Sequence, residues 1–231
     1  MTEAKWLVSV NPQSMLKWLR GKASDRKLRL FAVACCRPVA ARFTSPKSRQ
    51  SPQVLENFQT VVAVAEQFAD GLATDKERKA AHRTAQSAAR LVCTEWMLDA
   101  VTAAAFALQR ANAYLDWTEL FGSPEHGEWY EQTARYANDA CKRQLPTQSG
   151  FLRDIFGNPF RPVILNPAWR TSNVTALAQA IYDDRAFDRL PILADALEDA
   201  DCDNTDLLNH CRQPGEHVRG CWLVDLILHK E

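Results

Sequence analysis

Residues 216–229 read EHVRGCWLVDLILH, and this stretch decides the fold that the sequence predicts. Wound as a helix, it carries apolar side chains on nearly every side: Val218, Cys221, Trp222, Leu223, Val224, Leu226, Ile227 and Leu228. A helix that is apolar all round is buried among other elements. We therefore expect a central helix over 216–229. Asp225 is the one acid within its apolar part, so a buried arginine is its expected partner.

Outward from this stretch, apolar residues recur with the helical period through most of the chain. Turn and capping residues divide the pattern into expected helices at 12–20, from 24 or 25 to about 39, 53–70, 74–121 (one long helix, or two with a short joint), 125–144, 173–183, 190–199 and 204–212. Thr74 and Glu77 have the spacing of a capping box, and Asp203 is the expected cap of 204–212.

The segment 151–170, FLRDIFGNPFRPVILNPAWR, is apolar but interrupted by proline and glycine, and Pro146 to Gly150 should end the helix before it. We interpret 151–170 as an irregular connector. The predicted fold class is therefore all-α: a multi-helix bundle with an irregular Pro-rich connector and a small C-terminal cluster of short helices. The predicted domains are a helical bundle at 1–150 and, at 151–231, the connector and a C-terminal short-helix subdomain packed as one unit.

The composition is that of an ordinary globular protein. Of 231 residues, 46% are hydrophobic and 24% are charged, and 28 basic side chains balance 28 acidic ones, which excludes disorder as the main state. The N-terminus has no apolar signal region, and no stretch is long and apolar enough to span a membrane, so a cytoplasmic location without a membrane partner is expected. Seven cysteines, with no C-x-x-C pair, fit reduced buried thiols.

Cysteine and histidine gather near the C-terminus. His217 and Cys221 stand four residues apart, on one face of the expected helix, and Cys211 can approach them across the turn at 213–215. His210 is adjacent to Cys211, so only one of the two is expected to point inward. Cys211, His217 and Cys221 are therefore the candidate metal ligands, with zinc as the possible ion and no other cofactor expected. The alternative is a pair of core thiols beside solvated histidines.

The charge is unevenly distributed. Residues 1–49 hold eleven basic and two acidic side chains, for a charge of +9, whereas 183–206 hold nine acids and two arginines, for −7. Arg26, Lys27 and Arg29, near a helix start, are candidate contacts to phosphate or nucleic acid. The favoured alternative is that these basic side chains form a solvated face or ion pairs within the fold. Arg161, Arg212 and Arg219 are likewise expected to brace the irregular segment against the acidic helix at 195–203.

Calcium and enzyme templates fit poorly. The acids at 199–206 alternate like the start of a calcium loop, but Asn204 and His210 occupy the positions that need Gly and Glu. No nucleophile elbow, HExxH, Walker or dinucleotide motif is present, so no catalytic residue is assigned. Cys36 and Cys211 are the first candidates if a Cys–His pair is built in space.

Four segments resemble a set of uncharacterised paralogous proteins of planctomycete bacteria: SDRKLRLFAVACCR (24–37), GNPFRPV (157–163), ALAQAIYDDRAFDRLPILADALEDADCDN (176–204) and HCRQPGEHVRGCWLVDLILHK (210–230). This chain has Asp201 where that pattern has Gly before Cys202. The resemblance brings no activity or cofactor, and it implies an accessory or interaction role. The expected function is thus a non-enzymatic helical interaction module with an unidentified protein partner; a zinc-type metal protein and a nucleic-acid or phosphate binder are the alternatives.

Overall fold

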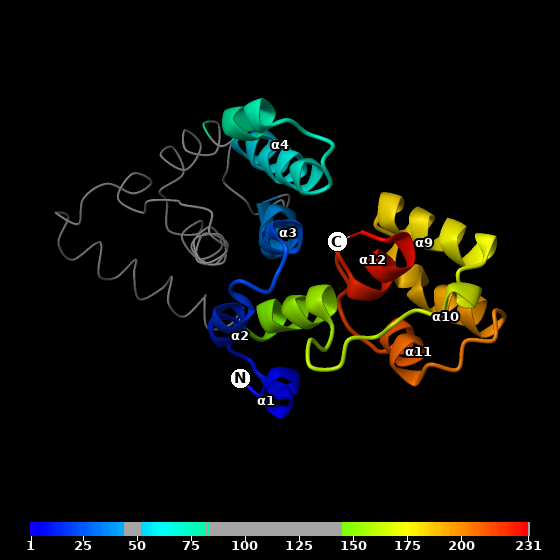
Figure 1. Ribbon diagram of the computed structural model, residues 1–231. Helices are drawn as coiled ribbons and strands as arrows, with labels where there is room; N and C mark the ends of the chain where they lie inside the picture. Colours follow the sequence, from blue (N-terminus) through cyan, green and yellow to red (C-terminus); the bar gives the residue numbers. More distant parts are fainter. Residues whose placement is uncertain (44–51, 82, 84–144, 231) are drawn as a thin grey trace.

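The computed structural model describes residues 1–43, 52–81, 83 and 145–230. Within these ranges all regular structure is helical and no strand is present, so the predicted all-α, multi-helix fold class is confirmed (Figure 1). The predicted helix at 125–144 and most of that at 74–121 lie outside the described residues, as do Cys93 and Cys141.

The N-terminal part contributes four helices: α1 (Glu3–Val8), α2 (Pro12–Leu19), α3 (Asp25–Phe43) and α4 (Pro52–Ala69). The caps follow from the sequence, since side chains of Thr2 and Asn11 accept from the first-turn amides of α1 and α2. The predicted capping box also forms, because the Thr74 amide donates to Glu77 Oε2 at 2.7 Å and the Glu77 amide to Thr74 Oγ1 at 3.3 Å.

Residues 145–156 are helical, so the prediction that this stretch is broken was wrong. A glycine inside a helix costs only about 1 kcal/mol relative to alanine, and Gly150 is followed by Phe151, Leu152 and Ile155, which are buried on one face. Their burial outweighs that cost, at about 1.5–3 kcal/mol each. The irregular connector therefore begins at 157, and the predicted domain boundary at 150 falls inside this helix.

The C-terminal part is the predicted cluster of short helices: η1 (Pro167–Trp169), α9 (Ser172–Asp184), η2 (Phe187–Arg189), α10 (Leu190–Glu198), α11 (Thr205–Arg212) and α12 (Trp222–Leu228). Helix α10 packs on α9 and α11, and α12 packs on α9. The last helix begins at Trp222 and not at 216, because Gly220 has φ +94°, a conformation outside the helical region. Asn204, and not Asp203, caps α11.

Asp201 adopts φ +61°, in the left-handed region where glycine is the default residue. Aspartate tolerates it better than most residues do.

Three apolar clusters lie within the described residues: two large cores and a small cluster of Val33, Cys36 and Val62 between α3 and α4. The N-terminal core joins α1, α2 and α3 to the helix at 145–156: Trp6, Met15, Leu16, Leu19, Phe31, Ala34, Cys35, Phe151, Leu152 and Ile155. The C-terminal core fills the space between α9, α10, α11 and α12. In Figure 1 the helix at 145–156 (green) lies between the blue N-terminal helices and the C-terminal group.

Ion pairs join the two parts of the molecule. Arg26 of α3 donates from Nη1 to Asp225 of α12 at 2.7 Å and from Nη2 to Tyr182 Oη of α9 at 2.7 Å. Asp70, after α4, accepts from Arg26, Tyr182 and Arg219. Glu66 Oε2 of α4 lies 3.6 Å from Arg219 Nη1. We call the set of Arg26, Glu66, Asp70, Tyr182, Arg219 and Asp225 the arginine network. The expected buried arginine partner of Asp225 is thus Arg26.

Candidate metal centre

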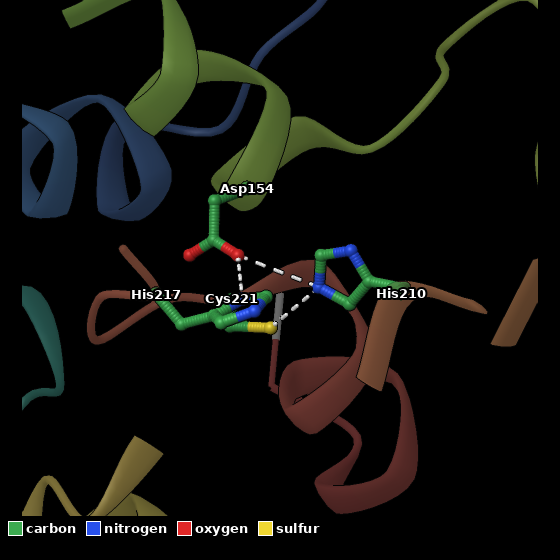
Figure 2. A group of neighbouring side chains, drawn as sticks. All are labelled: Asp154, His210, His217 and Cys221. Carbon is green, nitrogen blue, oxygen red and sulfur yellow. Dashed lines mark hydrogen bonds and ion pairs between the residues drawn. The ribbon is translucent and has the colours of Figure 1, made fainter. Parts of the chain in front are cut away.

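Four polar side chains converge where the two cores meet. Asp154 comes from the helix at 145–156, His210 from the last turn of α11, His217 from the segment between α11 and α12, and Cys221 from the residue before α12 (Figure 2). We call them the Asp/His/Cys group. All four side chains are nine-tenths or more buried.

The potential ligand atoms lie close together. One ligand atom from each residue can be chosen so that all four lie within 4.8 Å of one another. His210 Nε2 is 3.1 Å from Cys221 Sγ and 3.4 Å from Asp154 Oδ1, and His217 Nδ1 is 2.6 Å from Asp154 Oδ1. The four side chains thus face one another.

Asp154 orients His217. A carboxylate only accepts, so the short contact means that His217 Nδ1–H donates to Asp154 Oδ1, while the Val218 amide donates to Oδ2 at 2.8 Å. His217 Nε2 is buried and has no hydrogen-bond partner. Because the carboxylate lies on the Nδ1 side of the ring, Asp154 and His217 can bind the same ion only when His217 Nδ1 exchanges this hydrogen bond for the metal.

Nδ1, the other ring nitrogen of His210, faces a hydrogen-bond donor. The indole N–H of Trp222 approaches His210 Nδ1 at 3.1 Å, and an indole nitrogen can only donate. Nδ1 therefore holds a lone pair, and the neutral ring carries its proton on Nε2. The side-chain amide of Gln213 also lies 3.1 Å from Nδ1 and can present either its nitrogen or its oxygen.

The pKa values of the two acidic side chains in the group, Asp154 and Cys221, are shifted in opposite directions. Burial alone would raise the pKa of Asp154, but hydrogen bonds with His210 and His217 outweigh it and lower that pKa below its usual value. Burial, together with the nearby Asp154 carboxylate, raises the pKa of the Cys221 thiol far above its usual value. Without a metal, Cys221 is therefore a protonated and unreactive thiol.

The predicted ligands are only partly brought together. His217 and Cys221 belong to the group, but Cys211 does not: its side chain is buried in the C-terminal core. His210 takes its place, because adjacent residues on a helix point about 100° apart and only one can face the group. Asp154 had no local signal, since it lies 56 residues before His210 in the sequence.

The basic candidates contact the protein itself. Arg26 belongs to the arginine network, Lys27 Nζ donates to the Ile155 carbonyl at 3.1 Å, and Arg29 pairs with Asp25 at 3.3 Å. These contacts fit the favoured alternative of internal ion pairs. Arg212 likewise pairs with Asp195 and Glu198 of α10.

The suspected nucleophiles are also buried. Burial raises the pKa of both Cys36 and Cys211 to about 12, against which the nearby Arg37 and Arg212 act only weakly. Neither forms a thiolate near neutral pH, so neither has the property that an activated cysteine needs.

Comparison of the chain with protein-family models, curated proteins and solved structures finds no match. The planctomycete resemblance, the interaction role and the nucleic-acid alternative thus stay predictions. Among the described helices, none combines the length and hydropathy needed to cross a bilayer. The fold and the site together define an all-α protein with a buried candidate metal centre.

Proposed function

We propose that the protein binds one divalent transition-metal ion, zinc first, through Asp154, His210, His217 and Cys221. The observation that carries this proposal is the convergence of four ligand atoms within 4.8 Å in a buried site. Four protein donors complete the tetrahedral shell of a structural zinc site, leaving no position for a substrate or a reactive water. The role that follows is structural and not catalytic.

The charge balance supports a divalent ion. When Asp154 and Cys221 are ionised and both histidines are neutral, the group carries a charge of −2. A divalent cation cancels this charge, so the loaded site buries no net charge, which would otherwise be costly. The ion also deprotonates the thiol, whose pKa is raised by burial when it is free.

The donor types favour a borderline ion over a hard one. Calcium needs six to eight oxygen ligands and magnesium an octahedral oxygen shell. Here one sulfur and two nitrogens accompany a single carboxylate. Thiolate and imidazole ligands suit zinc, copper, iron and cobalt.

The test is elemental analysis of the whole chain, produced in zinc-supplemented medium and purified without chelator. We expect one zinc per chain in the wild type and its loss in Cys221→Ser. The matched control is Cys211→Ser, which removes a neighbouring buried thiol outside the group and should keep the ion. Cobalt loading adds a spectroscopic readout, because a cobalt–thiolate bond gives a charge-transfer absorption that Cys221→Ser should abolish.

Two outcomes would overturn the proposal. One is a folded wild-type protein that takes up neither zinc nor cobalt above background. The other is equal loss of metal in Cys211→Ser and Cys221→Ser, which would place the ion elsewhere.

A further inference from the structure

Two sets of polar contacts join the N-terminal and C-terminal parts, and they share one chain segment. The Asp/His/Cys group links Asp154, on the helix of the N-terminal core, to His210, His217 and Cys221 of the C-terminal part. The arginine network links α3 and the end of α4 to α9 and α12. The segment 217–225 contributes to both.

Along this segment the two kinds of residue alternate. Arg219 lies between His217 and Cys221, and it contacts Asp70 Oδ2 at 2.9 Å and stacks on the Tyr182 ring at 4.3 Å. Asp225, one turn after Cys221, holds Arg26. A change in the position of the segment therefore moves members of the arginine network.

The segment also packs directly on α3. A side-chain carbon built on Gly220 would lie 2.9 Å from Leu30 Cδ1. The backbone between His217 and Cys221 is therefore in direct contact with α3, and the contact leaves no room for a side chain. Val218 packs against the N-terminal core and its amide holds Asp154. Two of the four proposed ligands, His217 and Cys221, thus belong to the same chain segment that packs on α3.

We infer that the bound metal acts as a clasp: its occupancy sets how firmly α3 and the end of α4 are docked on the C-terminal core. This inference rests on the proposed metal site. Bound metal fixes His217 and Cys221 against Asp154, which places Arg219, Gly220 and Asp225 for their contacts with Asp70, Leu30 and Arg26. Metal loss leaves those docking contacts without that support, so the protein responds to metal availability through helices that contribute no ligand.

The first test is hydrogen–deuterium exchange of the full chain, loaded with zinc or treated with chelator. We expect metal removal to speed exchange around 217–221 and also in α3, which contributes no ligand. Faster exchange confined to the ligand-bearing segments, in protein that binds zinc stoichiometrically, would overturn the clasp and leave the metal site standing. Failure to bind zinc at all would instead overturn the proposed function.

The second test asks whether a change in the arginine network alters the affinity for zinc. Tyr182→Phe keeps the ring but removes the hydroxyl that joins Arg26 to Asp70. Because coupling between two sites is reciprocal, we expect zinc affinity to fall about tenfold, within the usual range of such coupling. The matched control is Glu198→Gln, which removes an exposed partner of Arg212 within the C-terminal cluster and should leave zinc affinity unchanged. An unchanged affinity in folded Tyr182→Phe would contradict the inference.

Discussion

At His210, a metal ion and the indole of Trp222 make opposite demands on one ring. The indole N–H at 3.1 Å requires a lone pair on Nδ1, which places the proton on Nε2. Metal binding through Nε2 requires the reverse, a lone pair there and the proton on Nδ1. Gln213 can accept that proton by turning its amide oxygen toward Nδ1, but the indole must then give up its acceptor.

Trp222→Phe should therefore tighten zinc binding. The substitution removes the donor that opposes the metal-binding tautomer, and one hydrogen bond of about 1 kcal/mol corresponds to roughly fivefold in affinity. Competition with a chelating indicator measures the change. Trp18→Phe is the matched control, because Trp18 packs against the N-terminal core, where it stacks on Phe160. Equal or weaker binding by Trp222→Phe would mean that His210 does not bind the metal through Nε2.

At the scale of elements, the turn before α12 depends on a glycine. Gly220 combines φ +94° with contact to Leu30 of α3 at a distance that a side-chain carbon does not tolerate. Backbone conformation and packing both require glycine at this position. Gly215, five residues earlier, has open space around its α-carbon and no positive φ.

Gly220→Ala should lower the free energy of unfolding by about 2–4 kcal/mol, the sum of backbone strain and overpacking against Leu30. Gly215→Ala, the control in the same turn region, should change it by no more than about 0.5 kcal/mol, as exposed substitutions usually do. Urea unfolding of the metal-free proteins measures both values. Similar changes in the unfolding free energy for the two variants would show that Leu30 moves aside and that packing against α3 does not fix the turn.

Elements defined by local chemistry were predictable, and those defined by contacts across the chain were not. Apolar period and capping residues located α2, α4, α9 and α10 to within one or two residues. The start of α12 was predicted six residues too early, because an apolar run does not reveal the close approach of α3 to Gly220. The helix at 145–156 is not predicted from the sequence because proline and glycine indicate a break, whereas burial of the residues after them, which favours the helix, depends on tertiary packing.

The same distinction holds for the candidate site. His217 and Cys221 were found because they are close in sequence and of metal-binding types. The prediction that only one of His210 and Cys211 points inward was wrong, because both side chains are buried: His210 faces the group and Cys211 lies in the C-terminal core. Asp154 is brought in by packing of the N-terminal core, which no local pattern encodes.

Over the whole molecule, buried thiols make metal-free stability depend on pH in a defined direction. Burial raises the pKa of Cys36 and of Cys211 to about 12 in the folded protein, against about 8.5 in an unfolded chain. Below pH of about 8.5 both states keep the protons and the stability is fully present. As pH rises further, only the unfolded state ionises, so each thiol costs about 1.4 kcal/mol of stability per pH unit.

Zinc affinity should change in the opposite direction over the same range. Binding ionises Cys221, whose free thiol has a raised pKa, so it releases a proton and strengthens as pH rises. We therefore expect urea unfolding in chelator to give falling stability above about pH 8.5, and the stabilisation added by zinc to grow at the same time. Cys211→Ser should reduce the fall in metal-free stability by the contribution of that one thiol, and it should leave the pH dependence of the zinc stabilisation unchanged. Cys221→Ser should abolish the pH dependence of the zinc stabilisation. A metal contribution that does not change with pH would mean that no thiol ionises on binding, and Cys221 would then not be a ligand.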